Sequence, residues 1–400
     1  MRHLARRITE TSKKSFGMYA RAAASGRDDL IHMELGKPYA DTPQHIKDAT
    51  IAAIQAGNVH YSDLPGVRHL REAIAEKLQR QNEIDVGADQ VVVTNGLTHG
   101  SYAAIMAFID DGDEVILLDP YYPQHVGKVE LAGGVPVLAK LDAKNNYAID
   151  AAAIESKITP RTKMIILINP CNPTGRVYSR EELTALADLA IKHDLLILSD
   201  EVYEEIVYDD ARHISIASLP GMADRTISLF AFTKSFAMDG WRIGYLTAPK
   251  AAIGAILKIT ANDVTHVNTF IQEGALAALT GDPEVLAQLV DDDRSKRDRV
   301  VTRLNQLPGI TCPWPEGTIY AFADVSALGL PSQVLSERLM DEAGVVVESG
   351  SFYGAAGEGK IRICFGSLSM EEIDLALDRI ADFTRGITDQ ITFDQDEIFP

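Results

Sequence analysis

The sequence Ser228-Leu229-Phe230-Ala231-Phe232-Thr233-Lys234-Ser235 is an apolar, strand-like run that leads into a lysine. The block Gly240-Trp241-Arg242-Ile243-Gly244-Tyr245 follows closely. A buried, deprotonated lysine amine can form a Schiff base with an aldehyde cofactor, and a nearby arginine can hold a phosphate of that cofactor. A lone lysine in such a place is usually a charged turn after a strand. The interpretation of Lys234 therefore depends on the other motifs of the chain.

A second motif is the polar loop Asn169-Pro170-Cys171-Asn172-Pro173-Thr174-Gly175, which directly follows the apolar run Met164–Ile168. In open α/β sheets, ligands bind at the carboxyl ends of the strands, and Asn172 is expected there. The alternative is a plain turn, since Asn, Pro and Gly are the usual turn residues.

A third motif places an acid at the end of a strand. The run Leu195–Ser199 leads into Asp200, and Tyr203 lies three residues further on. A carboxylate at this depth needs a partner. The protonated nitrogen of a pyridine ring would be such a partner, and the ion pair would keep the ring able to accept electrons. The alternative is a helix N-cap aspartate on a strand-to-helix loop.

A fourth motif joins the strand-like Val91–Val93 to a helix-like stretch, Ser101–Ile109, through Gly96. Free backbone N–H groups at a helix N-terminus form an anion site, so this segment is a candidate phosphate cradle. A fifth candidate is Arg362, which alternates with apolar neighbours on a short strand. Its guanidinium could fork onto a substrate carboxylate, although an arginine in such a strand is often only a surface charge.

Together these residues resemble the class I/II aminotransferases, the fold-type I enzymes that use pyridoxal phosphate. The resemblance runs from about residue 31 to about residue 383. It rests on motifs that occur in the family's order: Gly36-Lys37-Pro38, Asp41-Thr42-Pro43, Tyr61, Gly66, Leu70-Arg71, Asn172-Pro173-Thr174-Gly175, Asp200, Tyr203, Lys234, Arg242, Pro315, Gly317 and Arg362.

The resemblance implies a role for each matching residue. Lys234 would be the Schiff-base lysine, Asp200 would pair with the ring nitrogen, and Tyr203 would bind the ring's phenolic oxygen together with Asn172. Gly36 and Arg362 would bind the α-carboxylate of the substrate. Further cofactor-binding residues would be Gly96, Leu97, Thr98, Tyr122, which would stack on the ring, Thr233, Arg242, and Tyr61, which would reach the phosphate from a partner subunit.

The family also implies a fold. Between about residues 91 and 247, apolar strands alternate with helices, which is typical of βαβ units and a mostly parallel sheet. We therefore expect an α/β protein with the pyridoxal-phosphate-dependent transferase fold. Its large domain, with a seven-stranded sheet, would span residues 46–300. A smaller α+β domain would combine residues 1–45 with 301–386, and residues 387–400 would form a flexible acidic tail.

Composition limits the function classes. The chain has 400 residues, a net charge of −19 and three cysteines. The negative charge argues against nucleic-acid binding, and the few cysteines suit a reducing compartment. The histidines show no metal-ligand spacing, and neither a secretory signal nor a membrane-spanning run is found. We therefore expect a cytoplasmic enzyme without a metal. The acidic run Asp291-Asp292-Asp293 is expected on a solvated helix face.

The predicted reaction is transfer of an amino group between a 2-amino acid and a 2-oxo acid, by a ping-pong mechanism through Lys234. The same site would also support a C–S lyase, a decarboxylase or an oxidase. A homodimer with shared active sites is expected from the role that the resemblance gives to Tyr61. Side-chain specificity stays open between aspartate and apolar or aromatic substrates. Phe16, Met18 and Tyr19 could form an apolar lid, and Tyr353 could line the pocket.

Overall fold

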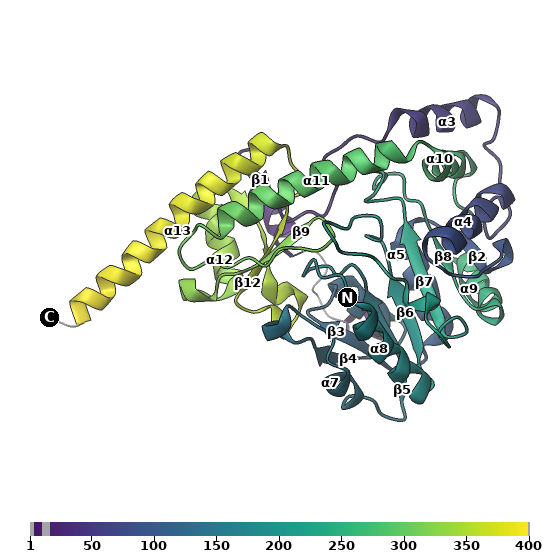
Figure 1. Cartoon of the computed structure of the whole chain (residues 1–400), viewed down its shortest axis with the longest axis horizontal. Coiled ribbons are helices and arrows are strands. Elements are labelled where there is room, and N and C mark those ends of the chain that lie inside the picture. Colours follow the sequence, from purple (N-terminus) through teal and green to yellow (C-terminus); the bar gives the residue numbers. More distant parts are fainter. Residues whose placement is uncertain (1–3, 10–16, 399–400) are drawn as a thin grey trace.

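The structure is a computed structural model that describes residues 4–9 and 17–398. The surroundings of the side chains are described up to residue 387. Its centre is a seven-stranded sheet in the order β2-β8-β7-β6-β5-β3-β4 (Figure 1). Only β8 runs antiparallel to its neighbours. The predicted α/β fold is confirmed. The strands are β2 (Val91–Thr94), β3 (Glu114–Asp119), β4 (Val135–Lys140), β5 (Thr162–Ile168), β6 (Leu196–Asp200), β7 (Thr226–Ala231) and β8 (Gly244–Thr247).

Helices cover both faces of this sheet, because successive side chains of each strand point to opposite faces. Val115 and Leu117 of β3 pack in one buried cluster with α5 and α9, whereas Ile116 and Leu118 pack in another with α8. The helices of this part are α3 (Gln44–Gln55), α4 (Arg68–Gln81), α5 (Gly96–Phe108), α6 (Pro123–Leu131), α7 (Ala151–Glu155), α8 (Arg180–Lys192), α9 (Lys250–Asn262) and α10 (Thr269–Thr280).

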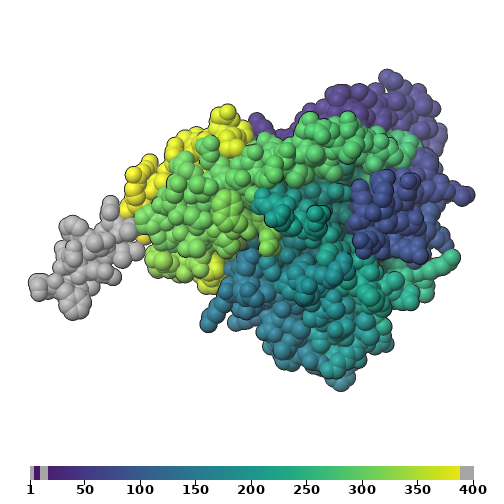
Figure 2. All heavy atoms as spheres, in the orientation of Figure 1, coloured from purple at the N-terminus to yellow at the C-terminus, as the bar shows by residue number. Residues whose placement is uncertain are grey.

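A second group of elements gathers at one end of the molecule, where Figure 2 shows the later residues in green and yellow. The three-stranded sheet β11-β12-β9 lies here, and β1 pairs in parallel with β10. The long helix α11 connects this end to the region of α10 (Figure 1). The elements are α2 (Gly17–Ser25), β1 (Ile31–His32), α11 (Pro283–Leu304), β9 (Tyr320–Asp324), α12 (Ser332–Arg338), β10 (Val345–Val346), β11 (Glu348–Ser349), β12 (Lys360–Cys364) and α13 (Met370–Ile398). The short helix α1 (Arg6–Thr9) lies instead against α6 of the first group.

One detail differs from the expected organisation. The last helix, α13, continues to Ile398 and takes in most of residues 387–400, which were expected to form a flexible tail. The boundaries proposed for the two domains stay a prediction. Within residues 4–9 and 17–398, no helix has both the length and the apolar character needed to cross a membrane.

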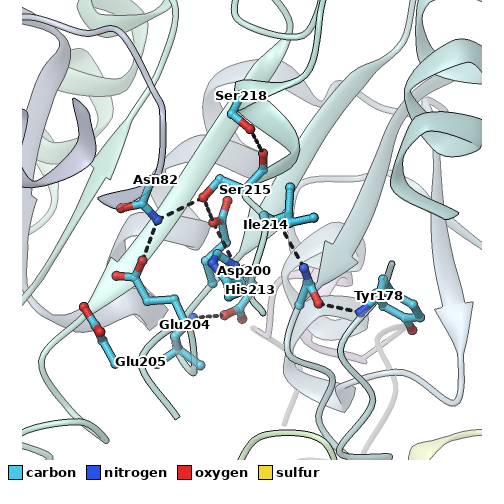
Figure 3. A network of polar contacts seen from close by, with 12 residues as sticks. Asn82, Tyr178, Asp200, Glu204, Glu205, His213, Ile214, Ser215 and Ser218 are labelled. Carbon is cyan, nitrogen blue, oxygen red and sulfur yellow. Dashed lines mark hydrogen bonds and ion pairs between the residues drawn. The ribbon is translucent and has the colours of Figure 1, made fainter. Parts of the chain in front are cut away.

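The loop after β6 is fixed by a network of buried polar side chains (Figure 3). Lys77 of α4 forms an ion pair with Glu204, and its amine donates to Asn82 Oδ1 at 2.9 Å. Asn82 Nδ2 in turn donates to Glu204 Oε2 at 2.6 Å and to Ser215 Oγ at 3.0 Å. Ser215 donates to the carboxylate of Glu201, which immediately follows Asp200. The network thus joins α4 to both ends of the segment that carries Asp200 and Tyr203.

The acidic run on α11 is only partly solvated, so the expectation for this run was wrong at one position. Asp291 and Asp292 are exposed, but Asp293 is half-buried, and a Cβ built on Gly366 would lie 3.1 Å from its Oδ1. Burial raises the pKa of the Asp293 carboxyl to about 7, and Lys296 opposes this shift. A residue pattern alone does not show that one of three adjacent aspartates turns toward the end of β12.

Replacing Lys77 by Met is expected to destabilise the protein by about 3–5 kcal/mol, because it leaves the buried Glu204 carboxylate without a cation. Urea denaturation followed by circular dichroism measures this loss. The matched control is Lys192→Met, which breaks an exposed ion pair with Glu155 and should cost less than about 1 kcal/mol. Adding Glu204→Gln to Lys77→Met should recover part of the loss. Equal stability of the two single variants would contradict the assigned role of the network.

Replacing Asp293 by Asn is expected to stabilise the protein more at pH 8 than at pH 5. Because the pKa of the folded carboxyl is about 7 and the ordinary pKa of an aspartate is 3.8, the folded state binds more protons between these values. The free energy of unfolding of the wild type therefore falls as the pH rises between these two pKa values. Urea midpoints at both pH values give the comparison, with the exposed Asp291→Asn as control. A gain from Asp293→Asn that is the same at both pH values would show that the carboxyl is not perturbed.

Candidate active site

A cavity of about 280 Å³ lies at the carboxyl ends of β5, β6 and β7, between the large sheet and β12. It is lined by most of the residues predicted for the site. These are Gly36, Leu97, Thr98, Tyr122, Asn172, Asp200, Tyr203, Thr233, Lys234, Arg242 and Arg362. Two predicted residues, Gly96 and Tyr61, do not line it.

Lys234 lies three residues beyond the end of β7 and points into this cavity. Its side-chain amine donates to the backbone carbonyl of Gly36, which comes from the N-terminal segment. Burial lowers the pKa of the amine, and the nearby Arg362 and Arg242 act in the same direction. A lysine in such surroundings is more readily deprotonated, which is the state that acts as a nucleophile or a base.

Asp200, the last residue of β6, is buried and has a defined partner. Its Oδ2 lies 3.0 Å from Nε2 of His125, which is itself completely buried on α6. Burial lowers the pKa of His125, and the neighbouring Lys128 lowers it further. In the neutral ring, Nε2–H then donates to Asp200, which fixes the orientation of that side chain. The ring of Tyr122 meets that of His125 edge-on, with 5.6 Å between the centroids.

Arg362 of β12 is buried at the opposite wall of the cavity. One terminal nitrogen donates to Asn172 Oδ1 at 3.1 Å, and the other donates to the backbone carbonyl of Glu34. The guanidinium lies 4.1 Å from the centroid of the Tyr320 ring and 5.0 Å from that of Tyr353. Its Nε is buried and has no hydrogen-bond partner among the described residues. The orientation of the guanidinium is therefore fixed, and its Nε–H is still available to donate to a ligand.

The remaining end of the cavity is suited to an anion. Gly96, the first residue of α5, has a φ of +75°, and a Cβ built on it would lie 2.6 Å from a terminal nitrogen of Arg242. Only glycine allows both this backbone conformation and this close approach. Leu97 and Thr98 follow in the first turn of the helix, where free N–H groups attract negative charge. Gly96 thus shapes this end of the cavity without lining it.

Tyr203 and Gly36 both lie against Tyr320, a residue that the sequence motifs did not single out. The hydroxyl of Tyr203 lies 2.8 Å from that of Tyr320. A Cβ on Gly36 would lie 1.9 Å from the same Tyr320 hydroxyl, so this position has no room for a side chain. The N-terminal segment therefore packs directly against the cavity wall.

The expected apolar lid is only partly present. Tyr19 lines the cavity, as does Tyr353, which confirms that expectation for Tyr353. Met18 is instead buried with Ala22, Met340 and Val346, because α2 turns that side chain into its own small core. Phe16 lies outside the described residues.

Tyr61 lies in the connection between α3 and α4 and is 88% exposed. Its ring contacts that of His266, with 4.8 Å between the centroids. Such exposure of an aromatic side chain within one chain is unusual for a residue that binds a ligand, and it leaves the ring free to meet another surface.

Several residues of the site were missed in the sequence. His125 follows the Tyr122 motif by three residues, one helical turn away, and this spacing was the available signal. Tyr320, Glu34 and Glu348 also line the cavity, but they come from segments that meet only in the folded chain.

Comparisons with known proteins show the family to which the chain belongs. Residues 28–380 match the family described as aminotransferase class I and II. The chain is 39% identical to an aspartate aminotransferase of Pyrococcus abyssi over 362 residues, which are 89% of this chain and 92% of that protein. It is 38% identical to aromatic-amino-acid aminotransferase 2 of Thermococcus litoralis, with 89% and 92% covered.

Solved structures agree as well. The aromatic aminotransferase of Pyrococcus horikoshii superposes with a TM-score of 0.87 at 36% identity, covering 92% of this chain and 98% of that one. The aspartate aminotransferase of Thermus thermophilus with maleate gives a TM-score of 0.89 at 35% identity, covering 96% and 100%. The chain therefore belongs to the aminotransferase class I and II family, and it is an enzyme that transfers an amino group between an amino acid and an oxo acid.

Proposed function

We propose that this aminotransferase works with pyridoxal phosphate bound in the cavity, and that Lys234 is its catalytic lysine. The observation that carries the proposal is the buried Lys234 amine, with a lowered pKa, between an anion-binding helix end and the buried Asp200–His125 pair. Pyridoxal phosphate supplies an aldehyde that binds amines covalently and a ring that accepts electrons from the substrate carbon.

The residues present fit this cofactor. The close approach of Gly96 to Arg242, at the start of α5, leaves space for a phosphate rather than for a side chain. We assign the phosphate to Leu97, Thr98, Thr233 and Arg242, with Gly96 allowing the approach. The oriented carboxylate of Asp200 suits a protonated ring nitrogen, which it would keep charged. Tyr122 would stack on the ring, and Asn172 and Tyr203 would donate to its phenolic oxygen.

The substrate would be held and deprotonated by groups from opposite walls. Arg362 binds the α-carboxylate through its fork of donors, beside Gly36, whose lack of a side chain allows the N-terminal segment to pack closely against Tyr320. The Lys234 amine, with its pKa lowered, would act as the base that takes the proton from the substrate α-carbon and as the acid that later returns it. Because one amino acid leaves as an oxo acid before the second substrate enters, the kinetics should be ping-pong.

Replacing Lys234 by Ala is expected to reduce transamination by about 10³-fold or more, because the variant lacks both the nucleophile and the base. Borohydride treatment of the wild type with pyridoxal phosphate, followed by mass spectrometry, should leave the cofactor's mass on the peptide that contains Lys234. The control is Lys258→Ala, on α9 outside the cavity, which should keep both properties. Normal turnover by the Lys234 variant would refute the assignment.

We also propose that the enzyme is a homodimer in which Tyr61 completes the partner's site. The support is the 88% exposure of Tyr61 and its absence from the cavity of its own chain. Apolar side chains around it are exposed too, namely Ile51, Ile54 and Val59. A pair of identical subunits related by a twofold axis would cover this surface twice and place each tyrosine in the other subunit.

Mixing subunits tests this arrangement. Tyr61→Ala alone should weaken cofactor affinity by about tenfold or more, because one bond to a charged phosphate is lost. Tyr61→Ala and Lys234→Ala proteins, refolded together in equal amounts, should recover about a quarter of wild-type activity, since half of the dimers then hold one intact site. A mixture no more active than the Tyr61 variant alone would show that Tyr61 does not act across subunits.

A further inference from the structure

Two acids that the proposed mechanism does not use, Glu34 and Glu348, line the active-site cavity. Both are buried, with only 3% and 4% of their surfaces exposed. Charged side chains are rarely buried without a cation to balance them, so their place in a substrate cavity calls for an explanation.

Glu348 lies beside the arginine that we assign to the substrate carboxylate. In the antiparallel pair β11–β12, Glu348 is directly opposite Arg362, so both side chains point to the same face of the sheet. No ion pair joins them in the described part of the chain. The Glu348 carboxylate instead accepts from the backbone N–H of Met18, at 3.1 and 3.2 Å, and from its own neighbour Ser349 at 3.1 Å.

Glu34 has one oxygen to spare. Its Oε1 lies 2.8 Å from Nδ1 of His32, whereas Oε2 is buried and has no hydrogen-bond partner among the described residues. A buried carboxylate oxygen without a donor is costly, so a ligand that brings a donor to it gains binding energy. Burial raises the pKa of Glu348 to about 7. The positive charge of Arg362 opposes this rise, and the neighbouring Glu34 adds to it.

A count of charges indicates which ligand fits. The cations that line the cavity, within the described residues, are Lys234, Arg242 and Arg362. The proposed function uses Arg242 for the phosphate, Arg362 for the α-carboxylate and Lys234 as the reactive amine. Arg362, whose charge also acts on Glu348, is then engaged by the α-carboxylate, and no further cation of the cavity lining is left for Glu34 and Glu348. A second substrate carboxylate would add negative charge to this acidic wall, whereas a cation would balance it.

The aromatic side chains of the same wall would also favour a positively charged ligand. Tyr19 follows Met18, whose N–H binds Glu348, and Phe352 lies four residues beyond Glu348. Aromatic faces attract ammonium and guanidinium groups as well as apolar chains.

We propose that Glu34 and Glu348 are specificity-determining residues, which select a 2-amino acid whose side chain ends in a positive charge and disfavour a dicarboxylic one. The inference rests on the proposed function, because it takes Arg362 as the site of the α-carboxylate. It names a substrate class that differs from the aspartate and aromatic amino acids in the names of the relatives.

Two unreactive ligands of equal length test the selection. 5-(Dimethylamino)pentanoate and pentanedioate each carry one carboxylate for Arg362 and differ only at the far end, which is a tertiary ammonium that cannot form a Schiff base in the first and a carboxylate in the second. Calorimetry on the enzyme loaded with pyridoxal phosphate should give the ammonium ligand an affinity about tenfold or more higher. The ratio should approach one in the double variant Glu34→Gln, Glu348→Gln. Glutamine keeps the size of the side chain and an oxygen that accepts from Met18 N–H.

The control is Glu358→Gln, an exposed acid that accepts from Ser332 outside the cavity, and it should leave the ratio unchanged. Turnover should follow binding, with kcat/KM for arginine falling and that for aspartate rising in the double variant. Tighter binding of pentanedioate to the wild type, or a ratio that the double variant does not change, would overturn the inference. Failure of the proposed function is recognised separately, because then borohydride would not mark Lys234 and no amino acid would be converted.

Discussion

The parallel pairing of β5, β6 and β7 is the constraint on which the site depends. Asp200 is opposite Ile168 on one side and Leu229 on the other, so the three strands end almost level. The residues that follow these ends, Asn172, Asp200 and Lys234, therefore reach one cavity although the chain separates them widely. A slip of one residue in either pairing would turn the Asp200 side chain to the other face of the sheet and away from His125.

The large sheet fixes this register through its apolar packing, and buried polar groups then secure the loops. Alternate residues of each strand enter separate clusters on the two faces, which excludes a slip. Beyond the end of β6, contacts from Lys77 and Asn82 hold the chain in place. The positions of Asp200 and Tyr203 in the cavity therefore depend on α4, a helix that contributes no residue to the cavity lining.

Much of this arrangement could be predicted from the sequence. The strands were found because fully buried parallel strands consist of continuous apolar runs, and the polar residues that end them were visible as interruptions. His125, Tyr320 and the two glutamates could not be found in this way, because their partners come from distant segments. Met18 and Asp293 were misjudged for a related reason, since composition does not show which side of a helix meets a core. The domain boundaries and the roles assigned to individual residues stay predictions.

The pairing of β1 with β10 has a consequence for biosynthesis. Ile31 leaves the ribosome before its partner Val345, which follows 314 residues later in the chain. At about 5–20 residues per second, this delay is roughly 15–60 s. All strands of the seven-stranded sheet emerge during that interval, whereas the segment of Glu34 and Gly36 must wait for its partners. The cavity wall that contains Glu34, Glu348 and Arg362 is therefore the last part of the cavity that can be assembled on a newly made chain.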